Sequence, residues 1–459
     1  MPAPTSWLTF LHLFAGCFNA PSQLLFEQLV SAWALCPGRR TLTRLWSVIP
    51  AQHRRRYEAY ARWVREGDWS LDELWRRLVV HLVAHLVPDG RLTLLADDTL
   101  VNKSGREVDG AGFFHDPVTS TAVAHKVTAW GLNVVVLALR VPAPWGGEPL
   151  ALPVMVRLHR KGEGELTLVE QAACMIFQLT RWLPEHRFRV VADGAYASLL
   201  RYELPRTVVI TRLRCDAALN DLAPPRTGRP GRPRTRGDRL PKPPDLAAQV
   251  TNWTSVKVCV RGQMIERQLW SRTLLWYETA RSRPLLLVIV RDPTGHQRDD
   301  YFISSDTSMA PAEVAGLYSD RWAIEDTNRN LKQYLGIQNP QSWVGDGPQR
   351  IVALAGWLYS AVWQWYVLVH AEHPTWPDRP WYTTKRTPSF ADAWPPSAAR
   401  PGRQFLALPP ATSTPRKSRP HSSPYWRTRR DQRRESQSSL LLGRDNPDVG
   451  ISQFTPISG

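Results

Sequence analysis

The sequence is poor in cysteine, and the few that it has are isolated. Five cysteines are spread over 459 residues and none belongs to a Cys-x-x-Cys pair: Cys17, Cys36, Cys174, Cys215 and Cys259. This spacing excludes a zinc finger and a disulfide framework, and it predicts a reducing, cytoplasmic compartment. The chain also lacks a Gly-x4-Gly-Lys-Ser/Thr loop, which argues against an NTP-driven enzyme.

Acidic residues are scarce relative to basic ones. The chain has 58 Lys and Arg against 41 Asp and Glu, a formal net charge of +17, and a pI of about 10.1. A balance this basic predicts a polyanionic partner, which is most often nucleic acid and less often an anionic membrane surface. The first Lys or Arg is Arg39, so the apolar stretch at residues 7–18 lacks the basic start of a signal peptide.

Long apolar runs are also rare, with one exception. Residues 351–370 carry no charge over a length that could cross a membrane. Tryptophans lie through the middle of the run, at Trp357, Trp363 and Trp365, whereas a membrane span concentrates them near its ends. We therefore expect a helix buried in a protein core, with a membrane span as the alternative.

The periodicity of apolar residues divides the chain into five parts. Residues 1–90 have helical spacing, with a Ser70/Glu73 capping signal and a helix, turn and basic helix around Gly38, which predicts a helical DNA-binding domain. Strand-like stretches separated by one amphipathic helix predict an α/β layout with a mixed sheet. We expect a catalytic core in residues 91–213 and 301–372, a β-rich insertion in 214–300, and a basic, disordered tail in 373–459.

A stripe of polar residues is the most informative motif. Tyr318, Arg321, Glu325 and Lys332 stand at offsets of 0, 3, 7 and 14, which places them on one face of a helix. Arg321 and Glu325 alone would be an ordinary surface ion pair. An acid flanked by two bases and a phenol can instead hold a metal ion beside a phosphate backbone.

Two aspartates elsewhere can join Glu325. Asp98 is predicted at the end of a strand over residues 92–96, and Asp193 at the end of another over 188–192. Strand ends converge on one edge of an α/β sheet, where sites form. Three carboxylates there could surround two Mg2+ ions, which suits an in-line phosphoryl displacement. Asp193 before Gly194 could also be a turn residue.

Asp97 competes with Asp98 for the first role. Adjacent residues of a strand face opposite sides of a sheet, so only one of the two can point toward the other acids. We favour Asp98, and leave Asp97 as the alternative.

These residues resemble a known family. The Y-x2-R-x3-E-x6-K spacing at Tyr318, Arg321, Glu325 and Lys332, with Asp98-Thr and Asp193-Gly-Ala-Tyr, resembles bacterial insertion-sequence transposases of the DDE type, in the insertion-sequence-four group. Residues 94–161 look like the DDE superfamily endonuclease domain. The resemblance covers roughly residues 20–370.

The resemblance implies a fold, an activity and a set of roles. It implies a ribonuclease-H-like core, Mg2+-dependent cutting at transposon ends with Mn2+ as a substitute, and joining to target DNA by a homodimer in a bacterial, nucleoid-associated setting. Asp98, Asp193 and Glu325 would be catalytic metal ligands, and Tyr318, Arg321 and Lys332 would contact backbone phosphates. Some relatives stack a flipped base on an aromatic of the insertion, for which Trp270 and Trp276 are candidates, although strand packing explains both.

A basic loop supplies further candidates for binding double-stranded DNA. Arg229, Arg232 and Arg234 lie in a Pro/Gly/Arg-rich stretch that cannot build a core. Generic phosphate binding is the expected role. His115, His125 and His159 lack metal-ligand spacing and are expected to be structural. Two alternatives to a transposase remain: a nuclease of the same fold without strand transfer, and a domesticated or decayed DNA-binding relative.

Overall fold

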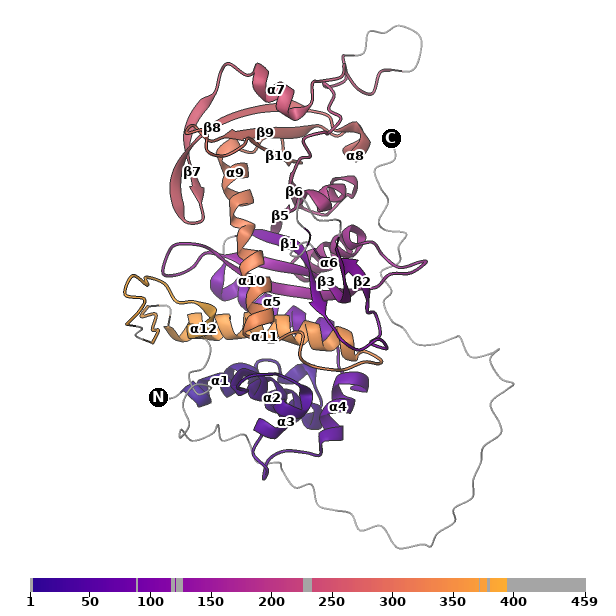
Figure 1. Ribbon diagram of the computed structural model, residues 1–459, viewed down its shortest axis with the longest axis vertical. Coiled ribbons are helices and arrows are strands. Elements are labelled where there is room, and N and C mark those ends of the chain that lie inside the picture. Colours follow the sequence, from indigo (N-terminus) through magenta and orange to yellow (C-terminus); the bar gives the residue numbers. More distant parts are fainter. Residues whose placement is uncertain are drawn as a thin grey trace, which may run out of the picture.

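Apolar residues at helical spacing build the N-terminal part of the chain. The computed structural model describes residues 3–87, 90–116, 120, 127–225, 233–370, 372–377 and 380–393. Its first helices are α1 (Ala3–His12), the 3-10 helix η1 (Ala15–Cys17), α2 (Ala20–Leu35), α3 (Leu42–Val48), α4 (Tyr57–Glu66) and α5 (Leu71–Leu86). Figure 1 shows α1 to α4 gathered at one end of the molecule, which confirms the expectation of a helical N-terminus.

Local capping explains where these helices begin. The side chains of Asn19, Thr41 and Ser70 each accept a hydrogen bond from the backbone N–H three residues later, which satisfies one of the unpaired donors of a helix start. Ser70 therefore caps α5 as predicted. Glu73 does not complete the capping box, because its carboxylate pairs with Arg76 and Arg77 instead.

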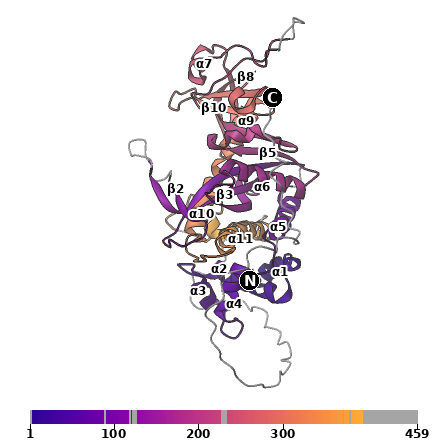
Figure 2. The ribbon, with the colours of Figure 1, turned by 90° about the vertical axis from the view of Figure 1, so that its right-hand side faces the viewer.

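A single mixed sheet forms the centre of the molecule. Its strands are β1 (Arg91–Asn102), β2 (Gly112–His115), β3 (Thr128–Val141), β4 (Leu150–His159), β5 (Arg187–Ala192), β6 (Thr207–Arg212), β7 (Thr254–Val260), β8 (Gln263–Leu274), β9 (Leu285–Arg291) and β10 (Asp300–Ser304). The spatial order is β2-β3-β1-β5-β6-β10-β9-β8-β7, and β4 also pairs with β3. Figure 2 shows β2 and the adjoining part of β3 projecting from the body of the sheet.

The core part of the sheet has the ribonuclease-H-like arrangement that was expected. β1, β5 and β6 are parallel neighbours, while β3 and β4 run antiparallel beside β1. One detail differs from the prediction, because β1 does not end at Asp98. It pairs with β3 as far as Asn102, whereas its pairing with β5 stops at Ala96 opposite Ala192.

The insertion continues the same sheet instead of forming a separate one. β10 pairs with β6, and β9, β8 and β7 follow in an antiparallel series. The turn between β7 and β8 touches the turn between β3 and β4, since a Cβ on Gly262 would lie 2.4 Å from the carbonyl of Gly147. Gly262 also has a φ of 74°, a conformation that glycine adopts without strain.

The remaining helices cover the two faces and the end of the sheet. They are α6 (Leu168–Trp182), the 3-10 helix η2 (Gly194–Arg201), α7 (Pro243–Gln249), α8 (Tyr277–Ala280), α9 (Pro311–Asp320), α10 (Trp322–Gln333), α11 (Gly347–His370) and α12 (Phe390–Ala393). α6 packs on β3 and β4, and α10 packs on β1 and β4.

Helix α11 is the long apolar run of the sequence. It is long and apolar enough to cross a membrane, and 94% of its apolar window is buried inside the fold. Trp357 lies against Phe14 and Phe26, with ring centroids 4.9 and 5.2 Å away. A fully buried tryptophan removes about 150–250 Å2 from water, which stabilises the fold by about 4–6 kcal/mol. The interpretation as a core helix that joins the N-terminal helices to the sheet is confirmed.

Side chains from two helices cover the outer edge of β4. Thr327 of α10 donates to the carbonyl of Ala151, and Ser360 of α11 donates to that of Pro153, both at 2.7 Å. Gln349 donates to the carbonyl of Val156 at 3.0 Å. An edge strand without such partners would present unpaired backbone groups.

The start of the expected tail is ordered and packed. Phe390 of α12 is buried and stacks on Tyr359 of α11 at 4.4 Å. Lys385 and Asp392 form a buried ion pair that also holds Ser389. Residues 385–393, which lie at the start of the expected tail, are therefore anchored to the fold by one aromatic side chain and one ion pair. Residues 394–459 lie outside the described part of the chain.

Candidate active site

Helices α9 and α10 form a nearly continuous rod that runs along the sheet from its β-rich end to α11 (Figure 1). Arg321 joins them in a helical conformation, with φ −54° and ψ −31°, and its N–H donates to the carbonyl of Tyr318. The expectation of one helix needs a correction: Tyr318 lies on α9, Arg321 at the junction, and Glu325 and Lys332 on α10. Because the junction stays helical, the four residues still share a face.

Ion pairs to the sheet fix the position of this rod. Asp320, 6% exposed, accepts from Arg140 of β3 at 2.6 Å. Glu313, at the start of α9, pairs with Arg189 of β5. A buried charge that is paired in this way is costly to move, so the junction is held against the sheet.

Three of the four stripe residues contact one another, since Arg321 lies over the ring of Tyr318 and pairs with Glu325. Arg321 donates to Glu325 Oε1 at 2.8 Å, and the side chain of Arg321 is only 14% exposed. Tyr318 stacks on Phe302 of β10 with ring centroids 4.2 Å apart. Burial lowers the pKa of Lys332, and the negative charges of Asp116 and Asp97 act in the opposite direction. The stripe therefore presents partly desolvated basic groups beside acids.

Asp97 is the acid of β1 that faces this stripe. Its Oδ2 accepts from the amide of Asn328 on α10 at 3.2 Å. Burial raises the pKa of Asp97 to about 7, with further increases from the charges of Asp98 and Glu325 and a decrease from Arg321. A carboxyl whose pKa is raised mainly by burial, and further by nearby acids, is a candidate for a functional site.

Asp98 faces the opposite side of the sheet. Its two oxygens accept from the hydroxyl of Tyr196 and the amide of Asn133, both at 3.0 Å. The preference for Asp98 as the acid that shares a face with Glu325 is therefore wrong in placement. The reason is the alternation of side chains along a strand, which continues through both aspartates because β1 does not end there.

Asp193 follows β5 on the side of Asp97. Ala96 and Ala192 are in register in the parallel pair, so the next residues of the two strands, Asp97 and Asp193, face the same way. Asp193 keeps an extended backbone, with φ −67° and ψ 165°, and its Oδ1 accepts from the N–H of Gly194 at 2.6 Å. Asp193 therefore caps η2 and also lies at the candidate site. Burial, and secondarily the charge of Asp193, raise the pKa of Tyr318, while Arg321 opposes them.

The donor atoms suit a divalent cation in chemistry. Carboxylate oxygens are the hard ligands that Mg2+ prefers, and burial, the main cause of the raised pKa of Asp97, makes a bare carboxylate costly there without a cation. In the described residues, however, no three His, Cys, Asp or Glu side chains gather as a ready metal-binding group. The carboxylate of Glu325 accepts from Arg321 in this arrangement.

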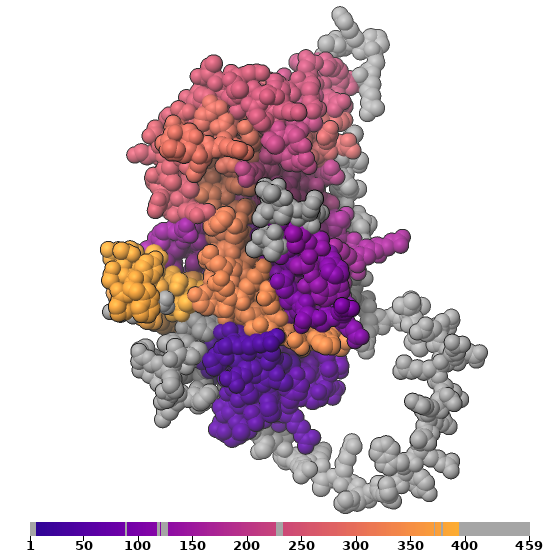
Figure 3. All heavy atoms as spheres, viewed as in Figure 1, coloured from indigo at the N-terminus to yellow at the C-terminus, as the bar shows by residue number. Residues whose placement is uncertain are grey.

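The rod that carries the site is accessible on one side of the molecule. Figure 3 shows residues of α9 and α10, coloured orange, exposed in a band from the β-rich end to the indigo N-terminal helices. The four stripe residues are partly exposed along this rod, and the side chain of Arg321 is the more buried partner of its ion pair with Glu325.

Arg234, the candidate of the basic loop that the structure describes, is not part of this site. Arg234 is exposed and pairs with Asp238 at 2.9 Å, and the neighbouring Thr235 contacts Tyr277 of α8 in the insertion. Arg229 and Arg232 lie outside the described residues. The structure thus brings Tyr318, Arg321 and Lys332 together and leaves Arg234 on the insertion.

Sequence reasoning missed some residues of the site. Asn328 stands three residues after Glu325, a helical spacing that could have identified it as a neighbour. Tyr196 stood in the Asp193-Gly-Ala-Tyr motif without an assigned role, and Asn133 had no signal, because its contact with Asp98 depends on the sheet order. Trp276 is buried and Trp270 is packed on the core, so strand packing accounts for both. His159 is buried, His115 is exposed, and His125 lies outside the described residues.

One comparison with known proteins shows the family of the chain. Residues 13–283, more than half of the 459-residue chain, match the family described as DDE superfamily endonuclease. This match includes Asp97, Asp98 and Asp193 and ends before the stripe. A search of curated proteins gives no match.

Among solved structures, a cryo-EM structure of piggyBac transposase in a synaptic complex with hairpin DNA is similar in part. The similarity covers 76% of this chain and 66% of that one, with a TM-score of 0.38 and 10% identity. The chain thus spans just under two thirds of that relative, and a likeness of this size adds nothing to the family match.

Proposed function

The chain belongs to the DDE superfamily of endonucleases, a divalent-metal-dependent class, and from this premise we propose that it is a DNA transposase of the insertion-sequence-four group. It cuts DNA at the ends of an insertion sequence and joins the freed 3′-hydroxyl to target DNA. The Tyr318, Arg321, Glu325 and Lys332 stripe is the signature of this group.

One observation carries the proposal, namely the meeting of the stripe with Asp97. Asn328 hydrogen-bonds Asp97 from the same helix that bears Glu325, and Arg321 lies close enough for its charge to lower the pKa of Asp97. Acids and phosphate-binding groups from positions more than 200 residues apart thus share one face, as phosphoryl transfer on DNA requires.

Each residue then has a role. Asp97, in place of Asp98, acts with Asp193 and Glu325 as the ligand set for two Mg2+ ions, with Mn2+ as a substitute. When bound, such ions activate the attacking oxygen and neutralise the leaving one. Tyr318, Arg321 and Lys332 hold the backbone phosphates next to the cut, and the fork of the Arg321 guanidinium orients the strand.

Other parts of the chain bind double-stranded DNA away from the cut. The helical N-terminal domain binds the terminal inverted repeats, and the basic loop with Arg229, Arg232 and Arg234 grips phosphates without sequence preference. Two copies hold the two ends as a homodimer in the synaptic complex, in the nucleoid of a bacterial cytoplasm.

The test is cleavage of DNA that carries the terminal repeats flanking the gene. The full-length chain is incubated with labelled repeat DNA and a supercoiled target plasmid in Mg2+, in Mn2+, or in EDTA. We expect cuts at the repeat ends in both metals, joined products with the plasmid, and no product in EDTA.

The products separate the alternatives. Cleavage without joined products identifies a nuclease of the same fold. Binding of the repeats without cleavage in either metal identifies a DNA-binding relative, and contradicts the proposal. The Asp97→Asn variant serves as the control for a contaminating nuclease, because it keeps the size and charge distribution of the purified protein nearly unchanged.

A further inference from the structure

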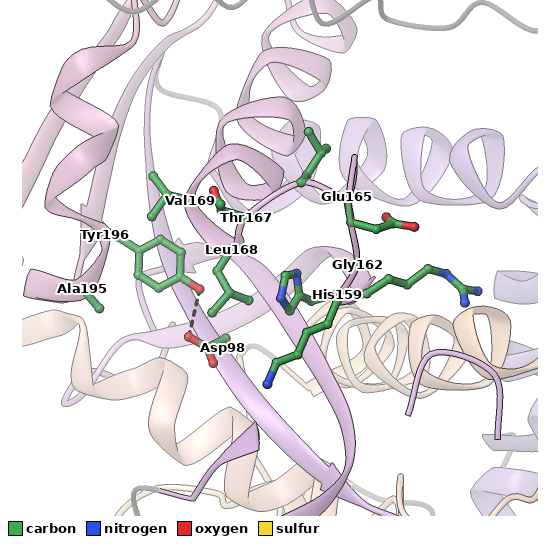
Figure 4. Close-up of a pocket in the computed structure, with 12 residues that line it drawn as sticks. Asp98, His159, Gly162, Glu165, Thr167, Leu168, Val169, Ala195 and Tyr196 are labelled. Atoms are coloured by element: carbon green, nitrogen blue, oxygen red, sulfur yellow. Dashed lines mark hydrogen bonds between the residues drawn. The ribbon is translucent and has the colours of Figure 1, made fainter. Parts of the chain in front are cut away.

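Asp98 has a complete set of contacts on the face of the sheet opposite to the stripe. Figure 4 shows the hydroxyl of Tyr196 pointing at the Asp98 carboxylate, with the hydrogen bond drawn as a dashed line. The second oxygen accepts from Asn133 of β3 at 3.0 Å. Beside them lies a pocket of about 440 Å3, bounded by the loop before α6 and by η2.

Tyr196 is tied to Asp193 by the backbone. It stands three residues after Asp193, at the first turn of η2, and its N–H donates to the carbonyl of Asp193 at 2.9 Å. That carbonyl also accepts from the Thr211 hydroxyl at 2.9 Å. Tyr196 is 1% exposed, so loss of the Asp98 acceptor would leave the hydroxyl of a buried residue without this hydrogen bond.

These contacts form a short rigid path between the two strands of the site. We propose that Asp98 is a positioning residue, whose carboxylate anchors Tyr196 and thereby keeps Asp193 beside Asp97 at the ends of β5 and β1. This proposal rests on the proposed function, because it gives Asp98 a role in the same site without making it a metal ligand.

The chemistry of the contacts supports anchoring over metal binding. Both oxygens of Asp98 already accept from neutral donors, and the carboxylate faces away from Glu325 and Arg321. A hydrogen bond to a charged acceptor is stronger than one between neutral groups, which suits an anchor for a buried phenol. Burial, with the charge of Asp98 as the second cause, raises the pKa of Tyr196, so the phenol remains a donor.

Asn133 makes it possible to remove the charge of Asp98 and keep its hydrogen bonds. Its Oδ1 is buried and has no hydrogen-bond partner among the described residues. In the Asp98→Asn variant, the new amide oxygen can accept from Tyr196, and the new NH2 can donate to Asn133 Oδ1 after that amide turns over. The variant keeps the anchor and removes the charge, whereas Asp98→Ala removes the anchor.

The experiment compares Asp98→Asn, Asp98→Ala, Tyr196→Phe and the Asp98→Ala/Tyr196→Phe double variant with Asp97→Asn. Cleavage of repeat DNA is measured as a function of Mn2+ concentration in the full-length chain. We expect Asp98→Asn to retain at least about a third of the wild-type rate. Asp98→Ala and Tyr196→Phe should each lose about tenfold and need about tenfold more Mn2+, and the double variant should be no worse than Asp98→Ala.

A matched control isolates positioning from general destabilisation. Tyr60→Phe removes another buried phenol hydroxyl, which donates to Gln28 in the N-terminal helices. It should lower the unfolding midpoint about as much as Tyr196→Phe and leave the Mn2+ dependence unchanged. An equal change in Mn2+ dependence for both variants would overturn the proposal.

Two further outcomes also decide it. If Asp98→Asn is as inactive as Asp97→Asn, then Asp98 is a ligand and the proposal is wrong. If the wild type does not cut, the proposed function fails, and the shift of the unfolding midpoint with Mn2+ replaces cleavage as the readout. A shift that weakens in Asp98→Ala but persists in Asp98→Asn supports the anchor, and a wild type without any shift contradicts it.

Discussion

Asp97 and Asp98 are adjacent in the chain and have opposite surroundings. Asp97 faces α10, where burial and two neighbouring acids raise its pKa to about 7. Asp98 faces the α6 side, where neutral donors satisfy both of its oxygens. The comparison teaches that an acid whose charge is left uncompensated by the fold is the better candidate for chemistry, whereas a fully satisfied acid serves the structure.

Neutralising Asp97 should have the largest effect on cleavage. Asp97→Asn should lower the cleavage rate by about a thousandfold or more, because an amide is a poor ligand for Mg2+. Binding of repeat DNA in a gel-shift assay should stay within about threefold of wild type, since the phosphate-binding stripe is intact. A rate near wild type would mean that Asp97 was assigned wrongly.

The second change removes the acid that α10 supplies. Glu325→Gln should reduce cleavage by about a hundred- to a thousandfold, and single-turnover rates on repeat DNA measure it. The amide can still accept from Arg321, so the helix junction should keep its geometry. Asp193→Asn belongs to the same test, and equal losses in both variants would indicate that all three acids act as a unit.

A smaller loss is expected from the base of the stripe. Arg321→Ala should lower cleavage by about 10- to 100-fold, the value of a charge-assisted hydrogen bond to phosphate. Arg321→Lys should recover only part of it, since an ammonium lacks the planar fork. Arg329→Ala is the control: Arg329 pairs with Asp326 on the same helix at the surface, and its loss should change the rate by less than about twofold.

Removal of the neighbour of Asp97 should have a still milder effect. Asn328→Ala deletes the hydrogen bond at 3.2 Å and should slow cleavage by about three- to tenfold. Asn328→Asp would place another acid next to Asp97 and should be worse than alanine, because like charges at this distance repel. If the aspartate variant were the faster one, crowding of negative charge at Asp97 would not limit the site.

The smallest effect concerns stability without metal. The pKa of Asp97, about 7 in the folded protein against 3.8 as the reference, means that the folded state holds this proton more tightly. Folding stability therefore falls as pH rises from about 4 to about 7. Asp97→Asn removes this loss, so in EDTA its unfolding midpoint should exceed that of wild type by about 2–4 °C more at pH 8 than at pH 4. A pH-independent difference would contradict the environment described for Asp97.

Much of this site could be predicted from the sequence. The exception is the choice between Asp97 and Asp98, and it has a physical cause. Spacing alone placed Tyr318, Arg321, Glu325 and Lys332 on one face, since helical periodicity is a local property. The choice between Asp97 and Asp98 depended on which layer each face of β1 meets. The packing of each face of β1 is determined by the order of the strands and by helices more than 200 residues away. A short sequence motif contains no information about either.

For the fold too, features set by local sequence patterns could be predicted and features set by distant contacts could not. The strands and helices of the core were predicted because their apolar patterns are regular, and α12 was missed because it is only four residues long in a segment rich in Pro, Ser and Arg. The sequence did not predict that the insertion extends the central sheet. The alternation of apolar and polar residues in a single strand does not show which other strands it pairs with.

The hydrogen bonds along the edge of β4 affect which substitutions the sequence can tolerate. Thr327 binds the carbonyl of Ala151, and a main-chain carbonyl is present whatever side chain occupies that position. The height of α10 above the sheet is therefore set by a contact that substitutions at residue 151 cannot remove. Homologous sequences can therefore differ in the apolar residues between α10 and β4 and keep the position of Glu325 relative to Asp97.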